Sequence, residues 1–307
     1  MSQLTVFSAM YPILPDKVTA SVKTCKAVAL VIDDKNQINK IIKLMGSEPA
    51  TQCLRHVKRV RHHRGETQII FSSVRKLCEI VCSDGCVCYK EYNNISVEHL
   101  DYIAKSLYNT CVTLLVTVPS SAPLTRIQYE QCIKQWPVSF HPDKRLEAVL
   151  AGTNFTKPEL STIKQHMRSV TTSNVNCAVI CDPVTNTVLA RAMGDPSNCL
   201  KHAVMLCLAQ IADRQRTAAE LFLQQGNEEH VRKKMKAELD YLCTGYDIYV
   251  AIEPCVMCSM ALVHSRIARV FFSESYSAWG GFTKRKLNTV EELNHSFEVF
   301  GGCNDSI

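Results

Sequence analysis

Apolar and polar residues follow regular periods in the second half of the chain. Thr156 stands before a proline and an early acid, and apolar residues at helical spacing follow, so a helix is predicted to begin there. Two apolar runs, 177–181 and 187–190, flank a turn sequence and predict a β-hairpin. Apolar residues at spacings of four and three then predict a second helix over 198–212.

The rest of this half contains one charged segment and two more apolar runs. Residues 213–245 are charged and favour helix, so we expect a helical insertion there. Residues 248–252 and 269–272 are typical of strands, and a helix is predicted between them at 255–265. The order of helix, hairpin, helix, strand, helix and strand fits an α/β domain in which helices cover a mixed sheet.

In the first half of the chain, strand-like and helix-like runs follow a different order. Its β-α-β-β-α-β order favours an α+β domain of the ferredoxin-like type. Prolines in 136–142 break both kinds of element, and we expect two domains, 1–150 and 151–307. The predicted strands are 27–32, 68–71, 86–89 and 112–118, and the predicted helices are 37–45, 97–108 and 127–135.

Length and composition are those of a globular protein with room for two cores. The chain has 307 residues, of which 46% are hydrophobic and 21% charged, and these values exclude a disordered chain. No run approaches the ~20 apolar residues that span a bilayer, and the first residues lack the layout of a signal peptide. We therefore expect a protein of the cytoplasm, the nucleus or both that binds no membrane, with most of its 16 cysteines reduced.

The excess positive charge lies entirely in the first half. Residues 1–150 hold 19 Lys and Arg against 13 Asp and Glu, whereas residues 151–307 hold 16 of each. A basic half joined to a neutral half indicates that the first domain meets a polyanion.

The sharpest chemical feature is the sequence Glu253-Pro-Cys-Val-Met-Cys258. Its two thiols, Cys255 and Cys258, share one face at the start of the predicted helix, where the helix N-terminus favours thiolates, the form that binds zinc. Two thiols make half of a tetrahedral site, and His202 is the candidate third ligand. Taken separately, a C-x-x-C is also typical of a redox pair, and a lone histidine usually has a structural role.

Together these residues resemble the signature of the zinc nucleoside deaminases, His-Ala-x followed by Pro-Cys-x-x-Cys. Segments 262–267 and 293–299 look like the tRNA adenosine deaminase branch of the cytidine-deaminase-like superfamily. This resemblance covers about residues 155–303. It implies a three-layer α-β-α domain that holds Zn²⁺ on His202, Cys255 and Cys258.

The first domain extends the resemblance more loosely. Its basic character and the sequence Trp136-Pro-Val are similar to the larger subunit of the eukaryotic wobble-adenosine deaminase. The resemblance implies that this half serves as a tRNA-binding domain for the anticodon arm.

The sequence departs from the family at the position of the catalytic acid. In the family's H-x-E triplet, the glutamate takes a proton from zinc-bound water and passes it to the base. This chain has Val204 there, and an isopropyl group holds no proton. Glu253 adjoins the ligands, but we interpret it as a backbone partner. The resemblance therefore implies a silent subunit of a heterodimer, whose partner carries an intact H-A-E triplet and converts adenosine to inosine at the tRNA wobble position.

Two other functions stay open at this point. One is an independent zinc deaminase that uses a different acid on free nucleosides or nucleotides. The other is a zinc-containing scaffold without enzymatic context. The basic first domain argues against the independent deaminase, because a small substrate needs no such surface.

Two cationic segments are candidates for RNA binding. The run 55–64 holds five Lys or Arg and three His, and phosphate neutralisation of this kind is largely independent of base sequence. A solvated face and a nuclear-import patch are the alternatives there. A second segment follows Tyr276 and Trp279, whose rings could stack splayed bases. The predicted RNA-binding residues are Arg55, Lys58, Arg59, Arg61, Arg64, Lys284, Arg285 and Lys286.

The fourth position of the predicted zinc site is also open. With Val204 a water there loses its polar partner, so a protein oxygen could replace it. Glycines at 301–302 would let the chain turn back, which makes Asp305 or the terminal carboxylate of Ile307 the candidate donor. A frayed terminus in solvent is the alternative.

Overall fold

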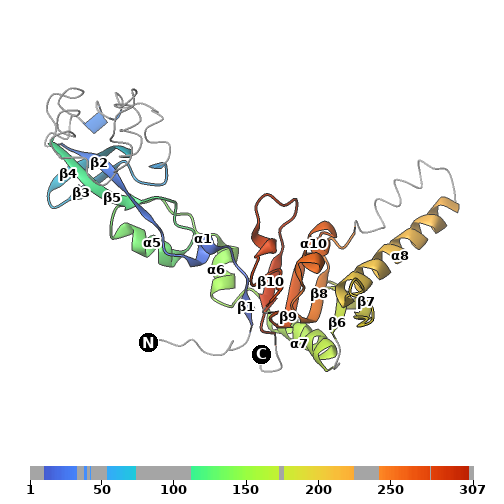
Figure 1. Cartoon of the computed structure of the whole chain (residues 1–307). Helices are drawn as coiled ribbons and strands as arrows, with labels where there is room; N and C mark the ends of the chain where they lie inside the picture. The colour runs from blue at the N-terminus through green and yellow to red at the C-terminus, as the bar shows by residue number, and fades with distance from the viewer. Residues whose placement is uncertain are drawn as a thin grey trace. The chain divides into compact units, whose positions relative to one another are not determined.

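The computed structural model describes residues 10–32, 38–39, 42, 54–73, 112–172, 176–224, 242–276 and 278–303. The chain divides into two compact units, one of Asp16–Glu147 and one of Met1–Pro15 with Ala148–Ile307 (Figure 1). This division differs from the expected ranges 1–150 and 151–307, because the first segment of the chain groups with the later unit. No helix in the described ranges is long and apolar enough to cross a membrane.

The later unit contains a six-stranded mixed sheet in the order β1-β10-β9-β8-β6-β7. Strands β8, β9 and β10 are mutually parallel, whereas β6 is antiparallel to both its neighbours. The strands are β1 (Tyr11–Pro12), β6 (Cys177–Asp182), β7 (Thr187–Met193), β8 (Asp247–Ile252), β9 (Arg269–Glu274) and β10 (Glu298–Gly301). The helices are α7 (Lys157–Thr171), α8 (Ala203–Gln224), α10 (Val256–His264) and the short 3-10 helix η3 (Leu287–Thr289), while α6 (Lys144–Leu150) contains the boundary between the two units.

Helices cover both faces of this sheet. Helices α8 and α10 pack on one face in a cluster that includes Val204 and Leu262. Helix α7 packs on the other face through Ile163, Met167 and Val170. The predicted three-layer α-β-α domain is therefore confirmed.

Capping and spacing patterns in the sequence predicted most of these helices and strands. Thr156 caps α7 in a reciprocal box, in which its amide donates to Glu159 Oε2 at 2.9 Å and its hydroxyl accepts from the Glu159 amide at 3.4 Å. Helix α8 begins later than the expected 198, because Asp195 and Asn198 hold the preceding residues in side-chain-bonded turns. The helix then continues to Gln224, and residues 225–241 of the expected insertion lie outside the described part of the chain.

Two strands at the sheet edge were not predicted. Tyr11 pairs with Gly301 and Pro12 with Phe300, and the Ile13 amide donates to the Val299 carbonyl at 2.8 Å. The residues after this pair enter the core, Ile13 against the α8 face and Leu14 against the α7 face. The edge of the sheet is thus covered by a segment from the beginning of the chain.

The other unit contains a four-stranded sheet in the order β3-β4-β2-β5, in which every neighbouring pair is antiparallel. Trp136 is fully buried in its core, and its indole N–H donates to the Lys58 carbonyl at 2.7 Å. Strand β3 lies within the cationic run and was not predicted. The elements are α1 (Asp16–Thr19), β2 (Thr24–Ile32), β3 (Val60–His63), β4 (Glu66–Ser73), β5 (Val112–Pro119) and α5 (Arg126–Ile133).

The ferredoxin-like assignment of this unit stays a prediction. The expected strand 86–89 and helix 97–108 lie outside the described residues, and only three residues of the expected helix 37–45 are described. Two of those, Ile38 and Ile42, pack against a buried cluster of the sheet.

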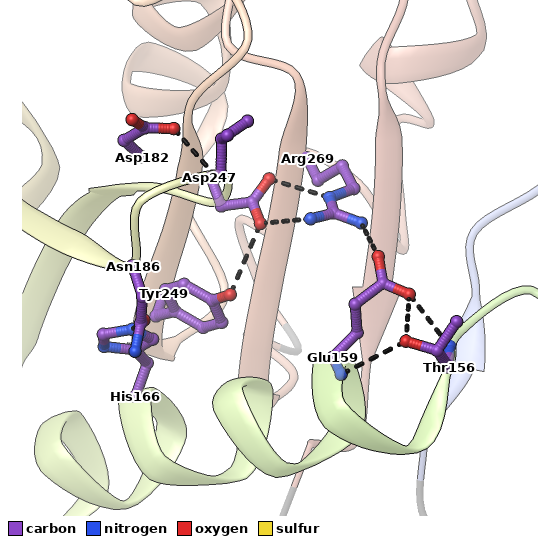
Figure 2. A network of polar contacts seen from close by, with 9 residues as sticks. Thr156, Glu159, His166, Asp182, Asn186, Asp247, Tyr249 and Arg269 are labelled. Atoms are coloured by element: carbon purple, nitrogen blue, oxygen red, sulfur yellow. Dashed lines mark hydrogen bonds and ion pairs between the residues drawn. The ribbon is translucent and has the colours of Figure 1, made fainter.

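A buried ion pair links the sheet of the later unit to α7 (Figure 2). Asp247 on β8 is fully buried, and Arg269 on β9 donates to its two oxygens at 2.8 and 2.6 Å. Arg269 also reaches Glu159 in the first turn of α7 at 3.6 Å, while the Tyr249 hydroxyl donates to Asp247 at 3.4 Å. Burial raises the pKa of Asp247, and the arginine opposes that shift. The arginine therefore joins two strands and a helix cap.

Asp247→Asn is expected to lower the free energy of unfolding by about 3–5 kcal/mol, because it leaves the Arg269 guanidinium largely buried without its main counter-charge. Urea unfolding followed by circular dichroism measures the change. The matched double variant Asp247→Leu, Arg269→Met removes both charges and should lose less stability than the single variant. A double variant less stable than Asp247→Asn would contradict this account.

Candidate metal centre

Two helix N-termini bring together the three predicted metal ligands. His202 precedes α8, and its carbonyl accepts the first helical hydrogen bond, from the Leu206 amide at 3.0 Å. Cys255 is the N-cap of α10, and Cys258 lies in the first turn of that helix. His202 Nδ1 lies 3.3 Å from Cys258 Sγ and 3.4 Å from Cys255 Sγ. All three ligand atoms lie within 4.8 Å of one another.

These distances fit a tetrahedral metal site. Usual zinc–sulfur and zinc–nitrogen bond lengths place a nitrogen and a sulfur ligand about 3.6 Å apart in a tetrahedron. The nitrogen–sulfur distances of 3.3 and 3.4 Å are close to that value. Within the described ranges, this is the one group of three or more His, Cys, Asp or Glu side chains close enough to share an ion.

The two thiols are electrostatically coupled. A hydrogen bond from the Cys258 thiol, assisted by the nearby His202, lowers the pKa of Cys255 to about 5. The same contact and burial raise the pKa of Cys258. Cys255, the thiol with the lowered pKa, thus lies at the positive end of α10, which favours a thiolate, and a bound cation would favour the thiolate form of both cysteines.

Val204 is the third residue of the His202-Ala-Val triplet, where the sequence predicts that the proton-transferring acid is absent. It lies in the first turn of α8 with 3% of its surface exposed, in the apolar cluster that contains Cys258 and Leu262. Among the described residues no carboxylate joins the three ligands. The surroundings of the ligands therefore offer an apolar wall in place of a general acid.

Glu253 has a different role from an active-site acid. It is 2% exposed, and its carboxylate accepts from the amides of Tyr276, Phe282 and Thr283 at 2.9, 3.0 and 2.7 Å. The Thr283 hydroxyl donates to both carboxylate oxygens, at 3.0 and 2.8 Å. With its oxygens engaged in this way, Glu253 is the backbone partner that we expected from the sequence.

The segment that Glu253 holds, residues 278–286, is here called the anchored loop. The Gly281 amide donates to the Pro254 carbonyl at 3.0 Å, and Gly280 pairs with Cys255 in an isolated bridge. A Cβ on Gly280 would lie 2.5 Å from the Glu253 carboxylate, and one on Gly281 would overlap the Ser259 side chain. The glycine pair is the sequence signal that could have revealed this close approach to the metal-binding turn.

The cationic run of the other unit forms an edge hairpin. Arg64 and Gly65 have φ values of 51° and 85°, as a two-residue turn between β3 and β4 requires. Arg64 is exposed in this turn, Arg55 and Lys58 are exposed in the segment before β3, and Arg59 is partly buried.

Arg61 differs from the other predicted RNA-binding residues of this run. Its guanidinium lies 3.9 Å from the centre of the Trp136 ring and donates to Gln68 Oε1 at 2.8 Å and to the Gln135 carbonyl at 2.7 Å. Burial also lowers its pKa. Arg61 therefore stabilises the core of its own unit, which charge counting along the sequence cannot reveal.

The remaining predicted site residues lie near the end of the chain. Lys284 and Arg285 are exposed in the anchored loop, whereas Lys286 donates to the Leu14 carbonyl at 3.2 Å. Asp305 and Ile307, the proposed fourth ligands, lie outside the described residues.

Comparisons with known proteins agree with this geometry. The family model of the cytidine and deoxycytidylate deaminase zinc-binding region matches residues 155–274. A Danio rerio protein named probable inactive tRNA-specific adenosine deaminase-like protein 3 is 33% identical over 318 residues, which cover 95% of this chain and 90% of that protein. The Homo sapiens protein of the same name is 33% identical, with 95% and 88% covered. The tRNA-specific adenosine deaminase subunit tad3 of Schizosaccharomyces pombe is 26% identical, with 84% and 82% covered.

Glu253→Ala is expected to release the anchored loop, because three backbone amides lose their acceptor and each unpaired buried donor costs about 1–3 kcal/mol. Hydrogen exchange measured by mass spectrometry should show faster exchange over 278–286. Glu274→Ala is the matched control, since Glu274 is an exposed acid at the end of β9. Equal protection of the loop in Glu253→Ala and in wild type would show that the carboxylate does not hold it.

Proposed function

The chain belongs to the family of probable inactive tRNA-specific adenosine deaminase-like proteins, and we propose that it is the non-catalytic, zinc-binding subunit of a heterodimer that forms inosine at the tRNA wobble position. Val204 is the observation that carries this proposal. The chain keeps the three metal ligands of the deaminases, but its buried isopropyl group takes the position of their acid. A fold that retains the metal site and lacks the acid supports a role beside a catalytic subunit.

His202, Cys255 and Cys258 would hold the zinc ion. When bound, zinc supplies the positive charge that lets both thiols exist as thiolates. The chain's own residues then fix the ends of α8 and α10 against each other, because the ligands lie at the N-terminus of each helix. The fourth ligand would be a protein oxygen, from Asp305 or the carboxylate of Ile307, or else water.

The partner is a deaminase subunit with an intact H-A-E triplet. Such a subunit supplies the proton transfer that is absent here, where general acid–base catalysis contributes about 100-fold to 10,000-fold. The Schizosaccharomyces pombe relative is itself named as a subunit, which supports an assembly of this kind. A tRNA substrate places the assembly in the cytoplasm, the nucleus or both.

The alternatives make different predictions about activity. An independent deaminase needs another acid beside the metal, and no carboxylate among the described residues groups with the three ligands. A scaffold without enzymatic context would leave the activity of a catalytic partner unchanged. The exposed cations of the run 55–64, Arg55, Lys58 and Arg64, favour a polyanionic substrate.

Expressed alone, the chain should form no inosine in tRNA, whereas co-expression with the catalytic H-A-E subunit should yield inosine at the wobble position, read by sequencing. Val204→Glu should stay inactive alone, because position 204 is buried in an apolar cluster and catalysis also requires substrate positioning. Activity of the wild-type chain alone would support the independent deaminase. Absence of activity in the pair would overturn the proposal.

Purified protein is expected to contain about one equivalent of zinc, and the double variant Cys255→Ser, Cys258→Ser should lose it because zinc binds thiolate ligands tightly. Elemental analysis measures the metal, and thermal unfolding should show a less stable later unit. Cys199→Ser is the control, since Cys199 is an exposed thiol outside the cluster. Full zinc content in the double variant would refute the ligand assignment.

Arg55, Lys58 and Arg64 are proposed to neutralise tRNA phosphates, together with Arg59 and the cations of the anchored loop. Changing these three to Ala should weaken tRNA binding and reduce the salt-dependence slope by about 0.7–0.9 for each phosphate that is no longer neutralised. The control triple Arg126→Ala, Lys134→Ala, Lys144→Ala removes the same charge from exposed positions of the same unit. An equal reduction of affinity in both triples would show that total charge, and not the run 55–64, sets the affinity.

Arg61 needs separate treatment in this experiment. Because it stacks on Trp136 and bonds to the Gln135 carbonyl, its truncation would disturb the core as well as any phosphate contact. It is therefore left unchanged in the triple variant.

A further inference from the structure

The anchored loop presents an unusual aromatic surface. Trp279 is 65% exposed and Tyr276, just before the loop, is 40% exposed. The other tryptophan of the chain, Trp136, is fully buried. Tryptophan and tyrosine are enriched at binding interfaces, because they combine a large apolar ring with a polar group.

Hydrogen bonds and a buried phenylalanine hold the backbone that carries these rings. Glu253 accepts from the Tyr276 amide at 2.9 Å, and the Gly280 amide donates to the Tyr276 carbonyl at 2.9 Å. Phe282 is fully buried in the core cluster, with its ring 5.7 Å from that of Phe297. Trp279 is therefore exposed on a well-supported backbone, and a preorganised ring loses less entropy when a ligand binds.

The charged residues that lie near these rings in the sequence indicate the kind of ligand. Lys284 and Arg285 are exposed and follow Trp279 by five and six residues, whereas Glu274 is the acid on the other side of the rings. Protein–protein interfaces are depleted in lysine. A site for single-stranded RNA, in contrast, combines aromatic rings that stack on bases with cations that neutralise the phosphates. Charge complementarity thus favours RNA over a protein partner.

We propose that Trp279, with Tyr276, stacks an unpaired base of the RNA substrate while Lys284 and Arg285 neutralise the adjacent phosphates. This inference rests on the proposed function and assigns to this subunit a base-stacking surface next to its metal-binding turn. Glu253 acts as a positioning residue, because it bonds to the amides on both sides of Trp279, at Tyr276 and Phe282.

The test uses the full chain in complex with its catalytic subunit and a synthetic anticodon stem-loop RNA as the probe. Trp279→Ala should weaken binding by about 5-fold to 150-fold, as expected for the loss of one stacked base. Trp279→Phe keeps a ring and should recover most of the affinity. Val184→Ala is the matched control, because Val184 is an apolar side chain 91% exposed on the β6–β7 turn. Binding of a fully paired RNA should be equal in all variants.

Fluorescence provides a second readout that does not depend on affinity. RNA should quench the emission of Trp279 in the wild-type pair, and comparison with Trp279→Ala separates this signal from that of the buried Trp136. The quenching should disappear in Trp279→Ala. If the catalytic subunit alone shifts the Trp279 emission, and Trp279→Ala weakens the pair instead of RNA binding, the surface is a protein interface and the proposal is overturned.

The same measurements test the proposed function and the stacking surface separately. If the wild-type pair neither binds nor edits the RNA, the proposed function fails and the stacking surface fails with it. If the wild-type pair binds the stem-loop and Trp279→Ala binds it equally well, the stacking proposal alone is wrong.

Discussion

The arrangement of Cys255 and the anchored loop depends on one constraint, the buried carboxylate of Glu253. A carboxylate that is 2% exposed must be satisfied by donors inside the protein, and here these come from Tyr276, Phe282 and Thr283. Because Cys255 follows two residues later, the same carboxylate links the metal-binding turn to the anchored loop. An acid beside the ligands thus contributes to architecture instead of proton transfer.

What the sequence revealed depends on how local each signal is. The helix after Thr156 could be predicted because a capping box lies within four residues. His202 could be grouped with the two cysteines because deaminase motifs have a fixed order, and the structure brings the three side chains together. The pairing of Tyr11 with Gly301 has no local signature, since it joins distant residues through two backbone pairs. The contact of the Arg61 guanidinium with Trp136 has no signature in charge counting, which grouped this residue with the other predicted phosphate ligands.

The apolar residue at position 204 fits the surrounding fold. Val204 packs into the same apolar cluster as Cys258, so the position remains a well-filled part of the core. On the opposite face, Arg269 and Asp247 fix α7 to the sheet independently of the metal ligands. The helices, the sheet and the cluster of His202, Cys255 and Cys258 are thus all present together with an apolar residue at position 204.

The pairing of β1 with β10 has a consequence for how the protein is made. Of the described strands, β1 is the first to leave the ribosome and β10 the last, yet the two are neighbours in the finished sheet. Ile13 and Leu14 must stay without their native packing until β10 has been synthesised, by which time the unit of Asp16–Glu147 is already complete in the nascent chain. The sheet edge can therefore close only after β10 has emerged, and until then this segment exposes apolar side chains that can misassemble.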